Sequence, residues 1–380
     1  MSANLPLGIL KATPEDFVVQ ELVGNPPIAV PFSEQTVVSG WDGKSNLTVF
    51  EMSKRGWETQ AAIREVARQL GVPFEAISTH GIKDKFARTS QLIGVRGKFQ
   101  TGFSHQDINL VQLTDGQEID SLALDNYGRL RRGGNWGNRF NILISSTATE
   151  LDLAAAKACP NLFGPQRLGR PGTEQIGRLF LEGKPEEAIE LLLATPSGVA
   201  FLRAKKLAGG TNDGALTHPD FQFSFKFEIQ KWQSYLWNTL LQEKVKELCD
   251  DVPAKLPLWN SSVQVAKMYE HLWKPPQLNP RVLRMIAISE RPSIVRPTNF
   301  QAKREAKGWR FTFDLPSGAY ATVVLSQLFK LKERHSRPAK KEEVVAVEVE
   351  QRQSEESIWS PEAARKRALL LERLQRMLDS

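Results

Sequence analysis

The chain has 380 residues, of which 41% are hydrophobic and 24% charged, and its formal net charge is +7. This length exceeds that of an average single domain and predicts two domains. The composition is that of a soluble globular protein with ample material for a core. The modest positive excess favours a polyanionic partner and excludes the extreme basicity of a ribosomal protein.

Metal, disulfide and membrane signals are weak. The two cysteines, Cys159 and Cys249, lie outside any CxxC pattern, and with five scattered histidines no zinc-ligand spacing arises, so no metal site is expected. The longest apolar runs, such as Ile189–Ala194, are far too short to span a bilayer, and Met1–Pro6 lacks the pattern of a secretion signal. A cytoplasmic protein is therefore expected.

In chain order, the first part of the sequence predicts strands around one helix. The helix is predicted over 58–70, where Ala62, Val66 and Leu70 recur at helical spacing, and Gly71 ends it. The strands are predicted from runs of β-branched and aromatic residues. These runs are Phe17–Glu21, Leu47–Met52, Ser90–Val95, Ile108–Leu113, Ser121–Tyr127 and Phe140–Ser145.

The pattern changes near Cys159. Helix formers dominate from Thr173 to about Leu248, whereas residues 250 to 297, rich in Pro and Trp, are left without assigned elements. Helices are predicted at Glu174–Leu181, Pro185–Leu193 and Phe227–Leu248. A strand returns at Trp309–Leu315, followed by a helical or mixed segment to Leu331.

This return of strand character predicts a first domain that is interrupted and later resumed. The expected divisions are 1–155 for its first part, 156–303 for a largely helical insertion, 304–335 for the return, and 336–380 for a charged C-terminal extension. Within the extension, Ser360-Pro361-Glu362 is typical of a helix start.

The segment Thr79–Gln91 carries the strongest chemical signal. It places one short carboxylate, Asp84, between Lys83 and Lys85, after Gly81 and before Arg88. Nearby cations favour the ionised carboxylate, and the same cations attract a phosphate backbone. The segment therefore predicts an anionic catalytic group within a nucleic-acid-binding surface, although the spacing alone is also that of an ordinary lysine-rich turn.

A second stretch, Gly128–Phe140, has the chemistry of an RNA-binding loop. Its four arginines can pair with phosphates, its glycines allow close backbone approach, and its aromatic rings offer stacking surfaces. The arginines are Arg129, Arg131, Arg132 and Arg139. A basic hairpin turn followed by a buried strand is the alternative interpretation.

Five stretches together resemble the TruD family of tRNA pseudouridine synthases. The signature Gly-x-Lys-Asp-x-x-Ala-x-Thr-x-Gln is met at Gly81–Gln91, and the Gly-Asn-x-Phe ending at Gly137–Phe140. Further matches are Lys11–Glu21, Asn161–Gly169 and Phe313–Thr322, although Leu162 and Leu168 replace two aromatic residues of the family pattern. A motif at Gln233–Asn238 also resembles a helix of the family's inserted domain.

The resemblance implies an α+β fold, with a catalytic domain built on a mixed, mostly antiparallel sheet and interrupted by the inserted TRUD domain. It implies that Asp84 is catalytic, that Phe140 and Asn138 line the uridine pocket, and that Phe17 and Lys11 belong to the active-site region and contact the substrate. Residues expected to contact RNA are Lys83, Lys85, Arg88, Arg129, Arg131, Arg132, Arg139, Gln166 and Arg167. For Phe17, burial in the core is the simpler interpretation from its place in a strand.

The implied reaction converts one uridine of tRNA, the family's habitual uridine 13, into pseudouridine without a cofactor. Asp84 would act as nucleophile or base, and the sequence does not choose between the two. The expected partner is tRNA, with no membrane, and a monomer is favoured. The alternatives are a non-catalytic RNA-binding protein on the same scaffold, which the leucines at 162 and 168 favour, and an unrelated soluble protein that is basic by accident.

Overall fold

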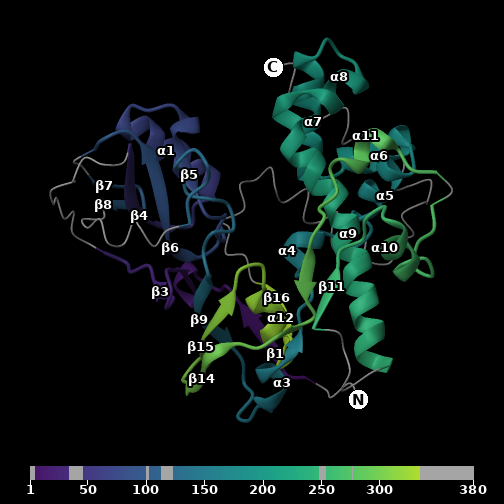
Figure 1. Cartoon of the computed structure of the whole chain (residues 1–380). Coiled ribbons are helices and arrows are strands. Elements are labelled where there is room, and N and C mark those ends of the chain that lie inside the picture. Colours follow the sequence, from purple (N-terminus) through teal and green to yellow (C-terminus); the bar gives the residue numbers. More distant parts are fainter. Residues whose placement is uncertain are drawn as a thin grey trace, which may run out of the picture. The chain divides into compact units, whose positions relative to one another are not determined.

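The computed structural model describes residues 5–33, 46–99, 102–112, 123–247, 254–275 and 277–333. The chain forms two compact units (Figure 1). Unit 1 extends to Cys159 and resumes at Val295, and unit 2 begins at Pro160 and ends at Ile294. The short strands β10 (Cys159–Pro160) and β13 (Ile294–Val295), at which the chain leaves and re-enters unit 1, pair with each other.

Unit 1 is built on one sheet, in which twelve strands of the described residues join. Its central order is β14-β15-β9-β2-β6-β4-β8-β7; β2 pairs with β6 and β1 with β16 in parallel, and the other pairings are antiparallel. The strands are β1 (Leu7–Leu10), β2 (Phe17–Val23), β3 (Ile28–Ala29), β4 (Leu47–Arg55), β5 (Ile77–Thr79), β6 (Arg88–Arg96), β7 (Phe103–His105), β8 (Ile108–Gln112), β9 (Gly137–Ser145), β14 (Thr298–Glu305), β15 (Gly308–Pro316) and β16 (Lys330–Glu333). The helices are α1 (Thr59–Leu70), α3 (Ala154–Lys157) and α12 (Ala321–Leu325), with 3-10 turns at Pro14–Asp16 and Phe74–Ala76. The expected mixed, mostly antiparallel sheet of an α+β fold is confirmed.

Helix α1 forms where the sequence predicts it. The Glu58 side chain accepts a hydrogen bond from the Ala61 N–H, and Gly71 ends the helix in the left-handed conformation at φ 66°. Its apolar face, which includes Ile63 and Val66, packs on Phe50 of β4 and on β6. Burying this stripe in the sheet stabilises the helix more than its intrinsic propensity does.

The strand registers align side chains into rows on one face of the sheet, because directly paired residues of neighbouring strands point to the same side. One row contains Phe313, Phe140, Val19, Thr89 and Lys54, in the order in which their strands pair. The next row contains Leu315, Asn138 and Glu21. Residues far apart in sequence are thus brought to one surface.

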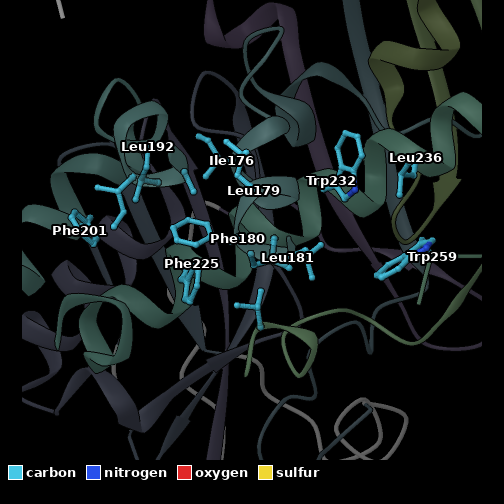
Figure 2. Close-up of a cluster of buried hydrophobic side chains, with 14 of the residues drawn as sticks. Ile176, Leu179, Phe180, Leu181, Leu192, Phe201, Phe225, Trp232, Leu236 and Trp259 are labelled. Atoms are coloured by element: carbon cyan, nitrogen blue, oxygen red, sulfur yellow. The ribbon is translucent and has the colours of Figure 1, made fainter. Parts of the chain in front are cut away.

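Unit 2 is largely helical. Its elements are α4 (Pro165–Leu168), α5 (Gln175–Leu181), α6 (Pro185–Leu193), α7 (Pro196–Leu207), α8 (Asn212–Thr217), α9 (Pro219–Glu247), α10 (Val263–Met268), α11 (Pro280–Leu283), and the paired strands β11 (Lys255–Pro257) and β12 (Glu290–Pro292). Helix α9 contributes Phe225 and Trp232 to a core that also holds Phe180, Phe201 and Trp259 (Figure 2). None of the described helices is long and apolar enough to cross a bilayer.

The structure corrects several sequence expectations. The insertion predicted at 156–303 is too long, because β14 (Thr298–Glu305) pairs with β15 and belongs to unit 1, as does Cys159. Of the strand predicted at Ser121–Tyr127, the described part makes only an isolated bridge between Leu124 and Leu130. Helices α7 and α8 fall in the region where helix formers dominate, but they were not predicted individually. The extension 336–380, with its expected helix, and Cys249 lie outside the described residues.

Candidate active site

Asp84 lies on a turn between β5 and β6 that side-chain hydrogen bonds hold in place. The Thr79 hydroxyl donates to the Gly81 carbonyl at 2.7 Å, and Gln91 Nε2 donates to the Thr79 oxygen at 3.0 Å and to the Gly81 carbonyl at 3.1 Å. The hydroxyl oxygen of Thr59, at the start of α1, accepts a hydrogen bond from the Lys83 N–H at 3.0 Å. The motif residues at 79, 81 and 91 therefore shape the turn that presents Asp84.

The Asp84 carboxylate meets Lys11, 73 positions earlier in the sequence. Lys11 Nζ lies 3.3 Å from Asp84 Oδ1 and 3.5 Å from Glu333 Oε1, and also 4.5 Å from the centroid of the Phe17 ring. Lys11 is 5% exposed and adopts a φ of 58°, a left-handed conformation that a non-glycine residue rarely takes. Such local strain is found where a side chain must point in one direction.

A buried ion pair lies next to the turn that carries Asp84. Lys83 Nζ donates to Glu21 Oε1 at 2.6 Å, and the other oxygen of Glu21 accepts from the Leu92 N–H at 3.0 Å. Glu21 is fully buried and Lys83 is 7% exposed. The prediction that Lys83 contacts RNA is therefore corrected: its ammonium is turned into the protein, where it fixes the residue next to Asp84.

A second buried lysine reaches the same turn from β4. Lys54 Nζ donates to the carbonyl of Asp84 at 2.7 Å and to that of Trp57 at 2.8 Å. The side chain is 2% exposed, and burial lowers the pKa of its ammonium to about 8 against the opposing attraction of Asp84 and Glu58. Two hydrogen bonds to carbonyls thus fix the backbone at Asp84, the carboxylate that the family resemblance predicts to be catalytic.

Beside this turn the sheet carries an aromatic cluster. The Phe140 ring lies 5.6 Å from Phe313 and 6.3 Å from Phe17, measured between centroids. Phe140 is 5% and Phe17 2% exposed, so both belong to the core of unit 1, in keeping with the simpler interpretation of Phe17. In the neighbouring row, Asn138 has a buried Oδ1 that accepts no hydrogen bond from the described residues.

Among the residues of unit 1 that are predicted to contact RNA, some are paired with a carboxylate and others are exposed to solvent. Arg139 makes a two-pronged ion pair with Asp314, at 2.8 and 2.9 Å, and Asn299 donates to the same carboxylate. Burial by itself raises the pKa of the Asp314 carboxyl. The hydrogen bonds from Arg139 and Asn299 outweigh this effect and hold the pKa below its usual value. By contrast Arg131, Arg132, Lys85 and Arg88 are exposed, and the Arg88 guanidinium lies 4.4 Å from the centroid of Phe32.

In unit 2, Gln166 is exposed on α4 whereas Arg167 is turned onto α9. Arg167 donates to Ser234 Oγ at 3.2 Å and to Gln230 Oε1 at 3.0 Å, and it lies 4.8 Å from the centroid of Phe227. The contacts that the structure gives Arg167 thus fasten the Asn161–Gly169 motif to the long helix.

Sequence reasoning missed Lys54 and did not single out Glu21. The signal for Lys54 was the alternation in β4, where it shares its face with the buried Phe50 and Met52. A lysine at an inward-facing position of a strand needs polar partners, and here these are backbone carbonyls. Within the described ranges, no group of three or more His, Cys, Asp or Glu side chains is arranged to hold a metal ion.

Comparison with known proteins identifies the relatives of this chain. The model of the family described as tRNA pseudouridine synthase D (TruD) matches residues 5–211, more than half of the sequence. A tRNA pseudouridine synthase D of Pseudoalteromonas atlantica is 25% identical, over 87% of this chain and 95% of its own length. A probable tRNA pseudouridine synthase D of Pyrococcus abyssi is also 25% identical, over 85% and 96% respectively.

The fold has a counterpart among solved structures. A Methanosarcina mazei protein assigned to TruD superposes with a TM-score of 0.50 at 20% identity, covering 87% of this chain and 95% of its own. This likeness supports the same α+β architecture. On the family match over more than half of its sequence, the chain belongs to the TruD family of tRNA pseudouridine synthases.

Proposed function

We propose that this chain isomerises one uridine of tRNA to pseudouridine, with Asp84 as the catalytic residue and position 13 as the target. The observation that carries the proposal is the pairing of the Asp84 carboxylate with the buried Lys11 ammonium at 3.3 Å. The Asp84 side chain keeps 21% of its surface exposed, so it is accessible to a substrate while its backbone is fixed. The target position rests on the family resemblance alone.

The chemistry needs a group near the anomeric carbon. The glycosidic bond between C1′ and N1 breaks, the base turns, C5 bonds to C1′, and the proton displaced from C5 is balanced by one gained at N1. A carboxylate can attack C1′ as a nucleophile or remove the C2′ proton as a base. In either role the carboxylate is held in position by Lys11, whose Nζ lies 3.3 Å from its Oδ1.

The residues around Asp84 can hold a uridine that has left its stack. Extruding a base costs a few kcal/mol, which protein contacts must offset. Four buried polar atoms near the turn have no partner among the described residues: His80 Nε2, Thr89 Oγ1, Gln91 Oε1 and Asn138 Oδ1. Such atoms are rare in native proteins, and a polar ligand would satisfy them. Asn138 Oδ1 can accept the N–H that uracil offers at N3.

Phe140 is proposed to contribute to the same pocket. Its ring is supported on two sides by Phe17 and Phe313, so it is held rigidly in the row that ends at Lys54. With only 5% of the residue exposed, we infer that it presents an edge to the uridine rather than an open stacking face. Phe17 then acts indirectly, by supporting both Phe140 and the Lys11 ammonium.

The test uses purified protein, unmodified tRNA transcripts and the Asp84→Asn variant, which keeps the shape of the side chain but not its charge. Pseudouridine is mapped by carbodiimide labelling and primer extension. The expected result is one new stop, one nucleotide 3′ to a single uridine, with the wild type and none with the variant, while both bind the transcript. Full activity of Asp84→Asn would overturn the assignment of the catalyst. Binding without product by the wild type would favour the non-catalytic alternative.

A further inference from the structure

The turn between Leu124 and Leu130 carries an aromatic residue that the proposed reaction does not use. These two leucines form an isolated antiparallel bridge, and Tyr127 stands between them with 78% of its surface exposed. A single exposed aromatic ring on a protein surface is common and needs no explanation. What distinguishes Tyr127 is the frame that holds it and the charge that surrounds it.

The frame is built by Asp125. Its Oδ1 accepts from the N–H groups of Tyr127 at 2.9 Å and Arg129 at 3.0 Å, and its backbone N–H donates to the Arg129 carbonyl at 2.7 Å. Gly128 provides the left-handed residue that the turn requires, at φ 69°. The backbone N–H of Arg129 is the main cause that holds the pKa of the Asp125 carboxyl below its usual value. The ring is therefore presented on an ordered turn.

Positive charge lies next to this ring and in the residues that follow it. The Arg129 guanidinium sits 5.4 Å from the centroid of Tyr127 and pairs with Asp125 at 3.0 Å. Arg131 and Arg132 follow directly, and both are exposed. Asp125 is the one acidic residue between positions 124 and 136, and its oxygens are occupied by this turn. An aromatic ring among arginines matches a nucleobase and its phosphates.

The turn is also fastened to the segment that leads to Asp84. The carbonyl of Arg131 lies 2.9 Å from His80 Nδ1, the Gly133 N–H donates to the His80 carbonyl at 2.7 Å, and the Leu130 N–H donates to Ser78 Oγ at 3.1 Å. His80 is 2% exposed, so this junction is buried. These contacts fix the turn relative to the segment that carries Asp84.

We propose that Tyr127 stacks on an unpaired base of the RNA substrate that neighbours the target uridine, while Arg131 and Arg132 contact its phosphates. This inference rests on the proposed function, because it takes the substrate to be RNA. Stacking on one aromatic side chain changes affinity by about tenfold or more. Tyr127 is thus a binding and not a catalytic residue, and its removal affects KM more than kcat.

The experiment compares Tyr127→Ala with Tyr127→Phe, which keeps the ring. In an Asp84→Asn background, each binds a tRNA transcript in which 2-aminopurine replaces unpaired bases one at a time. We expect fluorescence quenching at one position with the parent and with Tyr127→Phe. With Tyr127→Ala we expect that quenching to be lost and the Kd to rise about tenfold. Ile28→Ala, which removes another exposed apolar side chain of unit 1, is the matched control and should leave both unchanged.

The outcomes separate this inference from the proposed function. Quenching that persists in Tyr127→Ala, or an unchanged Kd, overturns the stacking platform whether or not the wild type makes pseudouridine. Conversely, a wild type that binds and quenches but forms no product leaves the platform standing and overturns the proposed reaction. Melting temperatures equal to that of the parent exclude a folding defect. In a Tyr127→Ala protein that keeps Asp84, loss of kcat without a rise in KM would also contradict a binding role.

Discussion

The Asp84 turn depends on two lysines that the solvent barely reaches. Lys83 is neutralised by Glu21, so that pair resembles a buried salt bridge in which losing one partner leaves an uncompensated charge. Lys54 differs, because its two hydrogen-bond partners are the uncharged carbonyls of Asp84 and Trp57. Removing this ammonium from water is unfavourable and lowers its pKa. The free energy of unfolding therefore depends on pH through Lys54.

Lys54→Met should change how stability varies with alkaline pH. The pKa of Lys54 is about 8 when folded and about 10.5 when unfolded, so between these values the unfolded chain binds the extra proton and wild-type stability rises with pH. The gain reaches about 3 kcal/mol at most, from 1.36 kcal/mol per pKa unit. The variant lacks this gain, so the wild type should become more stable relative to Lys54→Met between pH 8 and 10.5.

Urea unfolding of both proteins at half-unit steps of pH measures this difference. Lys85→Met, which removes an exposed lysine from the same turn, is the control for a change of charge. A difference between wild type and Lys54→Met that is the same at pH 7 and pH 10 would contradict the account of Lys54.

At this scale, the sequence predicts residue types better than their orientation. Lys11 and Asp84 were expected in one site from the family pattern, and they lie 3.3 Å apart. The inward orientation of Lys83 was not predictable, because a lysine in a lysine-rich turn normally points to water. It follows from Glu21, a carboxylate buried in β2 whose need for a partner becomes visible only when β2 and β6 are paired.

Among the elements, those that bury apolar residues could be predicted, and an exposed strand at the sheet edge could not. Helix α1 and strand β2 bury periodic or alternating residues, and strands β4 and β9 carry runs of β-branched and aromatic residues that are largely buried. Strand β14 shows no such alternation, since its side chains are mostly exposed along the sheet edge, and it was missed. Tertiary pairing with β15, rather than local preference, decides its conformation.

Strand β9 also explains the glycine that precedes Asn138. A Cβ added at Gly137 would lie 1.9 Å from the Leu315 carbonyl oxygen, well inside contact distance, and the obstacle is backbone that cannot rotate away. We expect Gly137→Ala to separate β9 from β15 locally, lowering stability by about 1–3 kcal/mol, the usual cost of overpacking. Asn138 and Phe140 would shift with the strand.

Thermal unfolding of Gly137→Ala against wild type tests this expectation. Gly81→Ala is the control for stability, because its added methyl group would meet only the end of the Lys83 side chain, at 3.9 Å. A melting temperature for Gly137→Ala equal to that of the control would show that β9 and β15 tolerate a wider spacing.

In the whole molecule, the insertion of unit 2 divides the chain of unit 1 into two segments. The site is complete only when both segments are present. Phe313 and Asp314, which contact Phe140 and Arg139, follow the insertion by some twenty residues. The two-domain expectation from chain length is consistent with this arrangement, yet length alone does not say that one domain is inserted into another. That inference needed strand character on both sides of a helical block.

The net charge of +7 also has a consequence for the whole molecule, because RNA binding by counterion release weakens as salt rises. Each phosphate contact contributes about 0.7–0.9 to the slope of log affinity against log salt. We therefore expect replacing both Arg131 and Arg132 by alanine to reduce the magnitude of the slope for tRNA binding by up to about 1.8. Filter binding by Asp84→Asn proteins between 50 and 300 mM salt, roughly the range in which such slopes are measured, gives the slopes. Arg68→Ala, which removes an exposed arginine that pairs with Glu65 on α1, should leave the slope unchanged. Equal slopes for the double variant and its parent would place the phosphate contacts elsewhere on the chain.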